Sequence, residues 1–352
     1  MEYLNSTKDS LKTIDETDIL YLNLFEYPEL FYGNINNIEN TDFCKYPKVI
    51  QEEMKKYEPI AVREMNNYNS TPSGVRLRFN TNSKRLIFKI ELKRKWDYQK
   101  LNNLNSSGFD VYNTDGKSYT HQEVFSPGHG HNIFAEEIIS PKNGNFCIFL
   151  PSYNSIKKIY LGIEKNSQIN ELNYPVNKQL PIVFYGNSVT QGAAASRSGN
   201  SFPNIISRKL NRDIINISCS SCCKGTANTA DLIGLMNCHA IIIDYTQNAY
   251  DTNIFRDTHE RFYKKIREYH PEIKIILLTT ANFNFWKAYD DFDVIVENTY
   301  NNAIYRNENT FLINQRKLFD ENEYDYIAVD KSHYTDYGMY KIAEKICEII
   351  KQ

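Results

Sequence analysis

Hydrophobic and polar residues alternate along much of the first half of the chain. Between residues 74 and 165 apolar side chains recur at every second position, and turn signals such as Asp115-Gly116 separate the segments. This rhythm is typical of short antiparallel strands that bury one face. We therefore predict an antiparallel β-sandwich of the jelly-roll type, which residues 1–70 are expected to wrap. The strongest alternating segments are 75–79, 86–92, 108–112, 145–150 and 159–163.

Continuous apolar runs replace this alternation in the second half. Such runs suit parallel strands that are covered on both faces. Stretches with helical spacing lie between and after them, and either Thr335 or Asp336 can cap the last one. Alternating strands and helices predict a three-layer α/β/α domain with a parallel sheet. The apolar runs are 182–185, 213–217, 240–245 and 273–279, and the helical stretches are 202–210, 254–269 and 339–350.

The length of the chain suits two domains. It has 352 residues, more than one average domain. The polar stretch 165–179 resembles a linker between the two rhythms. We predict an N-terminal sandwich domain at 1–175 and a catalytic domain at 176–352.

Net charge, apolar stretches and cysteine count limit the partners and the cellular location that we expect. The formal charge of -2 gives no reason to expect nucleic acid or an acidic membrane surface. The first 18 residues are polar, and no stretch approaches the roughly 20 apolar residues of a membrane span. Seven cysteines, an odd number, suggest no disulfide framework. These features favour a cytoplasmic location and leave the oligomeric state open.

A serine follows the first apolar run of the second half, and an aspartate and a histidine precede the last helix. Ser188 lies in Gly-Asn-Ser-Val-Thr-Gln-Gly at 186–192, and Asp330 stands three residues before His333. A serine hydroxyl becomes a good nucleophile when a base takes its proton, and that base needs a partner to orient it. Ser188, Asp330 and His333 are therefore predicted to form a catalytic triad.

Two further strand ends are expected beside this triad, because sites in open α/β sheets lie at the carboxyl ends of strands. The run at 213–217 leads into a Ser- and Cys-rich loop, and the run at 240–245 leads into Asn248. The arrangement differs from the nucleophile elbow of α/β hydrolases, because Thr190 stands where that motif needs glycine.

In these blocks the sequence resembles the SGNH (GDSL-type) esterases and acylhydrolases. The resemblance implies that Ser188 is the nucleophile, Asp330 the orienting acid and His333 the base. It also implies an oxyanion hole formed by the backbone of Ser188 and Ser221 and by the side chain of Asn248. Segments 73–76, 107–112 and 150–155 resemble the β-sandwich that precedes the catalytic domain in one SGNH subgroup.

The chain departs from the family pattern at several positions. Asn187 replaces the usual aspartate, and Ser221 replaces a glycine, so a positive φ there would be unfavourable. Cys222 and Cys223 stand at the positions of an Asn-Gly pair in the subgroup that the sequence resembles. The resemblance therefore does not determine the shape of the acyl pocket. Asn187, Arg197 and Cys222 are the candidate substrate-binding residues, although a structural role for Arg197 in its loop is an equal alternative.

The resemblance implies a serine esterase that needs no cofactor or metal and removes a small acyl group from a hydroxylated substrate. A carbohydrate or a glycosylated metabolite is the expected carrier. An acyltransferase with the same triad, or a binding protein that has lost activity, are the alternatives.

The cysteines and histidines also permit a zinc hypothesis. It would use Cys219, Cys222 and Cys223 with Cys238-His239, or the pair His129 and His131. We favour cysteines that act as small buried hydrophobic residues and loop histidines. Cys219 is expected to point away from Cys222 at the end of its strand.

Overall fold

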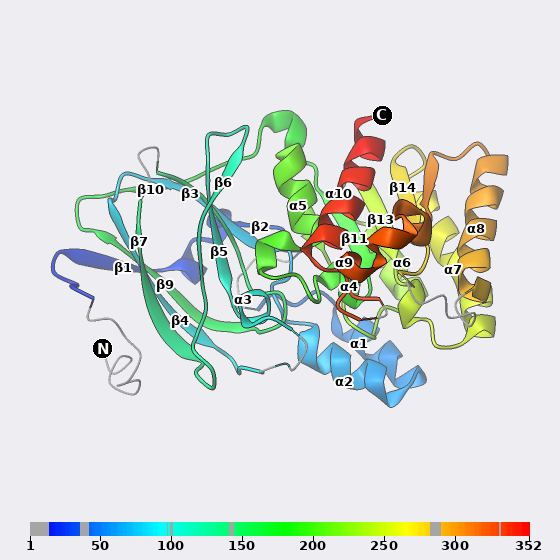
Figure 1. The fold of residues 1–352 in the computed structure, drawn as a ribbon, viewed down its shortest axis with the longest axis horizontal. Coiled ribbons are helices and arrows are strands. Elements are labelled where there is room, and N and C mark those ends of the chain that lie inside the picture. The colour runs from blue at the N-terminus through cyan, green and yellow to red at the C-terminus, as the bar shows by residue number, and fades with distance from the viewer. Residues whose placement is uncertain are drawn as a thin grey trace.

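Figure 1 shows a β-sandwich beside an α/β unit, with the chain passing from the first to the second. The structure is a computed structural model that describes residues 14–35, 42–96, 98, 101–140, 144–281, 290–330 and 332–352. The predicted fold class, an antiparallel N-terminal domain followed by a three-layer α/β/α domain, is confirmed.

The sandwich consists of two antiparallel sheets that enclose a core of Leu, Ile, Val and Phe side chains. Alternation explains the packing, because every second residue of a strand faces the opposite sheet. One sheet has the order β1-β9-β4-β7 and the other β10-β3-β8-β5-β6, with β2 paired to β3. The strands are β1 (Ile19–Asn23), β2 (Phe31–Tyr32), β3 (Arg76–Thr81), β4 (Arg85–Leu92), β5 (Phe109–Thr114), β6 (Tyr119–Phe125), β7 (Ile133–Ile139), β8 (Asn145–Phe149), β9 (Ile156–Glu164) and β10 (Ile169–Glu171).

A parallel five-stranded sheet forms the centre of the second unit, in the order β12-β11-β13-β14-β15. The strand order reverses at β11, so β11 and β13 flank the switch point where such folds bind ligands. The fifth strand, β15, was not predicted from the sequence, and its continuous apolar run comprises only residues 311–313. The strands are β11 (Ile182–Gly186), β12 (Ile214–Asn216), β13 (Ala240–Asp244), β14 (Lys274–Leu278) and β15 (Thr310–Ile313).

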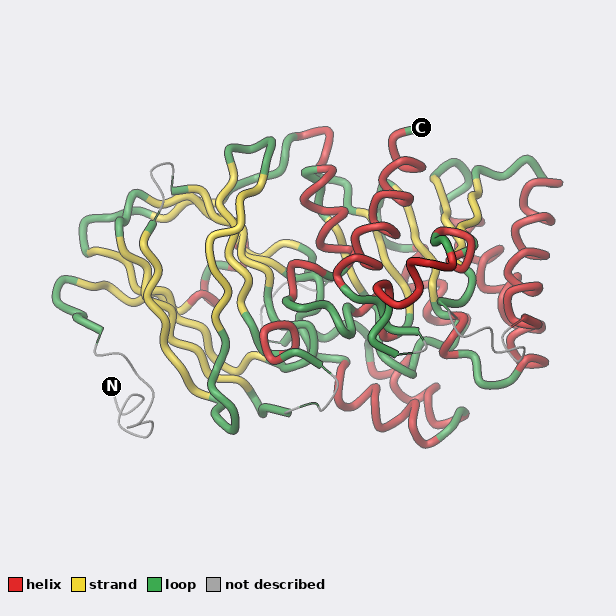
Figure 2. Tube along the Cα trace, viewed as in Figure 1, coloured by secondary structure: helices red, strands yellow, loops and turns green. Residues whose placement is uncertain are grey.

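Helices cover both faces of this sheet, as the coloured trace in Figure 2 shows. α6, α7 and α8 pack on one face and α5 and α10 on the other. Thr335 caps α10, so the first of the two candidate caps is the one in use. The helices are α1 (Lys48–Glu53), α2 (Pro59–Tyr68), α3 (Asn103–Ser106), α4 (Ser188–Gln191), α5 (Phe202–Leu210), α6 (Ala227–Gly234), α7 (Thr252–Tyr269), α8 (Asp290–Tyr305), α9 (Tyr324–Ile327) and α10 (Asp336–Lys351).

The segment that carries α1 and α2 packs against the α/β unit, below it in Figure 1. Ile50, Met54 and Met65 share a core with side chains of α6 and α7. The expectation that residues 1–70 wrap the sandwich holds for β1 and β2 but is wrong for α1 and α2. The apolar side chains of these short helices instead join the core of the second unit.

Two arginines of β3 are buried between the units. Arg76 and Arg78 alternate with apolar residues, and they are 0% and 1% exposed because their face of the sheet is covered. Arg76 forms an ion pair with Asp213, which precedes β12, and its Nε donates to the Tyr174 hydroxyl at 2.7 Å. The predicted linker at 165–179 therefore takes part in the structure, since β10 within it also pairs with β3.

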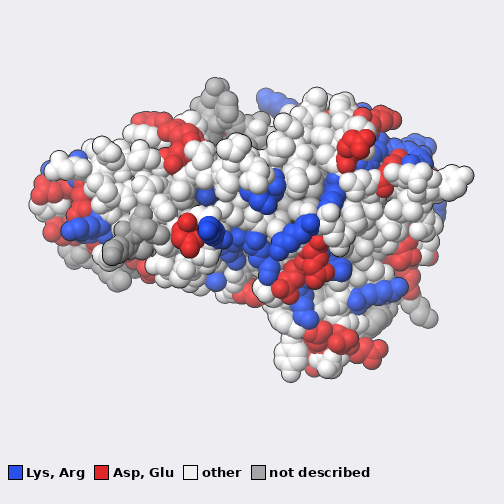
Figure 3. All heavy atoms as spheres, turned by 90° about the horizontal axis from the view of Figure 1, so that it is seen from above, with Lys and Arg blue, Asp and Glu red and all other residues white. Residues whose placement is uncertain are grey.

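Charged side chains of both signs share one face of the molecule (Figure 3). Basic side chains gather near the middle of the face in Figure 3, with acidic side chains close beside them. Among the described residues, no helix is both long and apolar enough to cross a membrane.

The buried ion pair predicts a large effect of Asp213→Asn on stability. The change leaves the Arg76 charge buried without its carboxylate partner, which should lower the free energy of unfolding by about 3 kcal/mol. Urea denaturation measures the difference. The matched control is Asp18→Asn, which breaks an exposed pair with Lys165 (78% and 59% exposed) and should have little effect. Equal losses in the two variants would contradict the prediction.

Candidate active site

The turn after β11 places Ser188 at the first position of α4. Asn187 caps this helix, its Oδ1 accepting from the Val189 N–H at 2.7 Å. The helix ends after one turn at Gly192, whose φ is +112° and whose missing Cβ would lie 2.8 Å from the Cβ of Ser201. The sharp start and end of α4 hold the Ser188 side chain, which is only partly buried, at the edge of the sheet.

His333 lies within hydrogen-bond distance of both Ser188 and Asp330. Ser188 Oγ is 2.8 Å from His333 Nε2, and His333 Nδ1 is 2.9 Å from Asp330 Oδ2. Asp330 Oδ1 also accepts from the backbone N–H groups of Ser332 and His333 at 3.0 and 2.9 Å. The structure therefore brings together the three residues that the sequence singled out.

The state of Asp330 fixes the tautomer of His333. Burial acts to raise the pKa of Asp330, but hydrogen bonds from the His333 ring and from two backbone N–H groups outweigh it and hold the pKa well below the usual range. An ionised carboxylate only accepts hydrogen bonds, so His333 Nδ1 carries the ring proton. Nε2 is then free to accept the proton of the Ser188 hydroxyl.

A buried carboxylate that the sequence analysis did not single out lies beneath this triad. Asp244 ends β13 and is fully buried. Its Oδ2 accepts from Thr190 Oγ1 at 2.6 Å and its Oδ1 from Gln315 Nε2 at 3.0 Å. The hydroxyl of Tyr334, next to His333, donates to Gln315 Oε1 at 2.6 Å. One hydrogen-bond network thus connects the turn that carries Ser188, here called the nucleophile turn, to the loop that carries His333. The sequence signal for this network was a single acidic residue at the end of an apolar strand.

The loops after β12 and β13 meet beside Ser188. Asn248 is 4% exposed, and its Nδ2 donates to the Cys219 carbonyl at 3.2 Å, which leaves the second amide hydrogen available. Ser221 has a φ of +62°, the geometry that a glycine would favour. Within the described part of the chain, the N–H groups of Ser188 and Ser221 have no backbone acceptor. These donors can serve a developing oxyanion.

The N-terminal unit supports the back of the same turn. The Tyr153 hydroxyl is 3.2 Å from the Ser188 carbonyl oxygen and 3.0 Å from Ser220 Oγ. Gln191 Nε2 donates to the Ser152 carbonyl at 3.0 Å, while its Oε1 accepts from the Ser220 N–H at 2.8 Å. The sandwich thereby holds both the nucleophile turn and the loop that faces it.

The three candidate substrate-binding residues are engaged in structural contacts. Asn187 is fully buried, caps α4 and donates to Gln247 Oε1 at 2.7 Å. Arg197 Nη1 lies 2.8 Å from Oδ2 of the buried Asp110, so Arg197 joins the two units. This contact is structural, like the alternative role that the sequence analysis gave for Arg197. Both side chains therefore have a structural role, and their contact with a substrate stays a prediction.

The third candidate, Cys222, forms a disulfide with Cys219. The expectation that Cys219 points away from Cys222 is wrong, whereas the expected burial of both residues is observed. The strand ends before Cys219, and the tight turn that follows brings the two side chains to the same side. The bond also removes two thiolates from the set that the zinc hypothesis needed.

The burial of Asp244 predicts a pH-dependent stability. Desolvation raises its pKa to about 7, against hydrogen bonds from Thr190 and Gln315 that lower it. Between the ordinary aspartate value near 4 and about 7, the folded state keeps a proton that the unfolded chain has lost, so stability falls as pH rises. Asp244→Asn should remove this slope.

Urea denaturation at pH 4.5, 6 and 7.5 provides the test, with the exposed Asp257→Asn as control. The stability of Asp244→Asn relative to the unsubstituted protein should increase with pH, and that of the control should stay constant. A constant difference for Asp244→Asn would contradict the assignment.

Two families match the chain. Residues 179–351 match the "GDSL-like Lipase/Acylhydrolase family", and residues 20–169 match the family described as "N-terminus of Esterase_SGNH_hydro-type". No curated protein matches the chain significantly.

Several solved structures share the fold of this chain. A GDSL-like lipase from Bacteroides ovatus has a TM-score of 0.76 at 23% identity, over 95% of this chain and 98% of that one. The salicylyl-acyltransferase SsfX3 from a tetracycline biosynthetic pathway has a TM-score of 0.74 at 16% identity, over 94% and 96%. A family two carbohydrate esterase from Clostridium thermocellum, in complex with cellohexaose, has a TM-score of 0.53 at 14% identity, over 80% and 93%.

The structural similarity to these proteins shows the shared fold, and the two family matches between them cover nearly the whole chain. The chain therefore belongs to the GDSL-like lipase/acylhydrolase family of SGNH-type esterases, in the form that carries this N-terminal domain, as the sequence predicted.

Proposed function

We propose that the protein is a serine esterase that removes a small acyl group from a hydroxylated substrate through an acyl-enzyme at Ser188. The observation that carries the proposal is the 2.8 Å contact between Ser188 Oγ and His333 Nε2, with Asp330 behind the histidine. This arrangement combines a nucleophile, a base and an orienting acid in one partly exposed site.

The proposed reaction has two halves. His333 Nε2 takes the proton of the Ser188 hydroxyl as the oxygen attacks the ester carbonyl, and then donates this proton to the leaving alcohol. Water enters, loses a proton to His333 and attacks the acyl-enzyme, which releases the acid and restores Ser188. Asp330 stays ionised and stabilises the imidazolium that forms in each half.

The proposed oxyanion hole comprises the N–H groups of Ser188 and Ser221 and the side-chain amide of Asn248. Their supporting contacts come from the protein itself, because Asn248 is anchored on the Cys219 carbonyl and α4 is capped by Asn187. Fixed donors need no reorganisation as the negative charge develops, and each is worth on the order of 10²–10³ in kcat.

A carbohydrate or a glycosylated metabolite is the proposed carrier of the acyl group. The support is the shared fold with a carbohydrate esterase whose structure contains cellohexaose. The proposed acyl group is acetyl-like.

Acyl transfer to an acceptor other than water is the second candidate function. A salicylyl-acyltransferase shares the fold over 94% of this chain, and the same triad would serve either reaction. A binding protein without activity is the weaker alternative, because the Ser188–His333–Asp330 contacts are complete.

The cytoplasmic location stays a prediction, although disulfides such as Cys219–Cys222 are more usual in oxidising compartments.

Hydrolysis of p-nitrophenyl acetate tests the esterase proposal. Ser188→Ala and His333→Ala should each lower kcat by at least about 10³-fold, since the nucleophile and its base act as a unit. His129→Ala, a change of an exposed sandwich histidine, should keep full activity. The absence of turnover in the unsubstituted protein, or full activity in Ser188→Ala, would refute the proposal.

Adding an acceptor alcohol to the same assay separates hydrolysis from transfer. A hydrolase should give acetate as its main product at every alcohol concentration. A product in which the alcohol carries the acetyl group, formed in preference to acetate, would favour the acyltransferase.

A further inference from the structure

The four-residue turn Cys219–Cys222 contains Ser221, whose N–H is one of the proposed oxyanion donors. The Cys222 N–H donates to the Cys219 carbonyl at 3.3 Å, so Ser221 is the third residue of the turn, with a φ of +62°. Glycine is the usual residue at a turn position with positive φ. A side chain in the left-handed region costs about 1 kcal/mol, so serine needs help to stay there.

Hydrogen bonds hold the first half of this turn. The Cys219 N–H donates to the Gly186 carbonyl at 3.1 Å, and the Cys219 carbonyl accepts from Asn248 at 3.2 Å. The Ser220 N–H donates to Gln191 at 2.8 Å. All three partners lie at the ends of β11 and β13 or on α4, so the first half is fixed to the frame of the site.

The second half is held differently. Among the described residues, the recorded polar or covalent contacts of the Ser221–Cys222 backbone and side chains are the turn hydrogen bond and the disulfide. The disulfide joins the first and fourth residues of the turn, whose Cα atoms are 5.7 Å apart. It therefore ties the free half of the turn to the fixed half.

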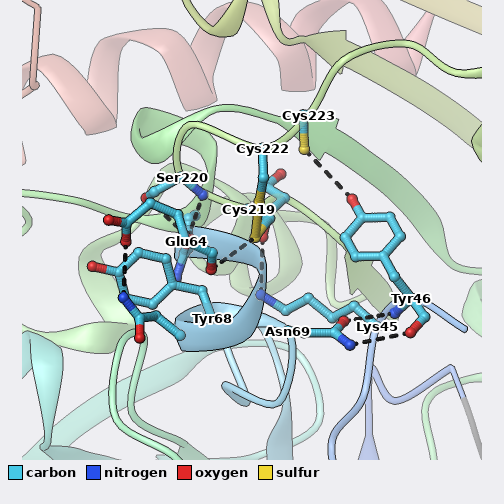
Figure 4. The surroundings of a disulfide bond; sticks show 12 residues. Lys45, Tyr46, Glu64, Tyr68, Asn69, Cys219, Ser220, Cys222 and Cys223 are labelled. Atoms are coloured by element: carbon cyan, nitrogen blue, oxygen red, sulfur yellow. Dashed lines mark hydrogen bonds between the residues drawn. A yellow bond between two sulfur atoms is a disulfide. The ribbon is translucent and has the colours of Figure 1, made fainter. Parts of the chain in front are cut away.

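The surroundings of the disulfide indicate a structural bond, not one that is reversibly reduced. Cys219 and Cys222 are 0% and 2% exposed and lie next to the segment that carries α2 (Figure 4). Cys219 Sγ lies 4.0 Å from the Glu64 carbonyl oxygen, and Lys45 Nζ donates to the Ser218 carbonyl at 2.9 Å. A reductant cannot reach the sulfur atoms without displacing this cover.

We propose that the Cys219–Cys222 disulfide is a positioning device for the reaction, which holds Ser221 in the left-handed conformation that glycine would adopt unaided. The inference rests on the esterase proposal, in which the Ser221 N–H is an oxyanion donor. The bond forms by exchange with a small-molecule or protein disulfide. One cysteine thiolate attacks it and releases a thiol, and the second thiolate closes the bond and releases another, so the two cysteines are oxidised and the donor disulfide is reduced.

The test compares kcat and KM for p-nitrophenyl acetate in matched variants. Cys219→Ala/Cys222→Ala should lower kcat by about 10- to 100-fold and change KM little, because a misplaced donor affects the transition state most. Adding Ser221→Gly to this pair should recover most of kcat, since glycine adopts a positive φ without strain. The control is Cys347→Ala, which removes a buried free cysteine of α10 and should leave kcat unchanged.

Each result bears on the proposal. An unchanged kcat in the double variant, or a loss that Ser221→Gly does not restore, overturns the positioning role while the effect of Ser188→Ala still supports the esterase. Alkylation of the unreduced, denatured protein should modify five of the seven cysteines, and modification of all seven overturns the disulfide itself. A protein without any turnover overturns both proposals.

Discussion

Two parallel strands, β11 and β13, end side by side where the strand order of the sheet reverses, and the rest of the site depends on this constraint. The Asn187 N–H donates to the Asp244 carbonyl at 2.9 Å, so the two strand ends stay in register beyond the last strand residues. Ser188 follows one strand and Asn248 the other. Beneath them, the buried Asp244 side chain joins the nucleophile turn to the loop that carries His333.

The N-terminal half acts on this arrangement from two sides. From one side, Asp110 of β5 accepts from Arg197 and from the Gly199 N–H at 2.9 Å, which fixes the loop that leads into α5. From the other, Tyr153 contacts both Ser188 and Ser220. The sandwich is therefore a structural wall of the site, and its buried arginines and aspartate are explained by this contact between the units.

Sequence patterns predicted the fold, and they singled out three residues that the structure brings into contact, for physical reasons. Period-two alternation and continuous apolar runs report directly which faces of strands are buried, and Ser188, Asp330 and His333 stand at the ends of recognisable elements. Contacts between distant segments leave no such pattern. The Asp244–Gln315 hydrogen bond, the packing of α1 and α2 on the second unit and the interface role of Arg197 all depend on how separate elements meet.

The Ser221 region illustrates a different limit. The sequence identified Ser221, Cys222 and Cys223 as departures from the family pattern and predicted that a positive φ at Ser221 would be unfavourable. The structure has that φ together with a disulfide across the same turn. The serine and the cysteine pair, which look like separate departures in the sequence, are thus parts of one local structure. The sequence did not show this, because residue spacing alone does not reveal the direction of the cysteine side chains.

Covalent trapping tests the central claim that Ser188 is an activated nucleophile. A fluorophosphonate reacts with a serine only when a neighbouring base removes its proton, and mass spectrometry of the digested protein locates the adduct. We expect one adduct per chain, on the peptide that contains Ser188, and none in His333→Ala. No adduct on the unsubstituted protein, or an adduct on another residue, would contradict it.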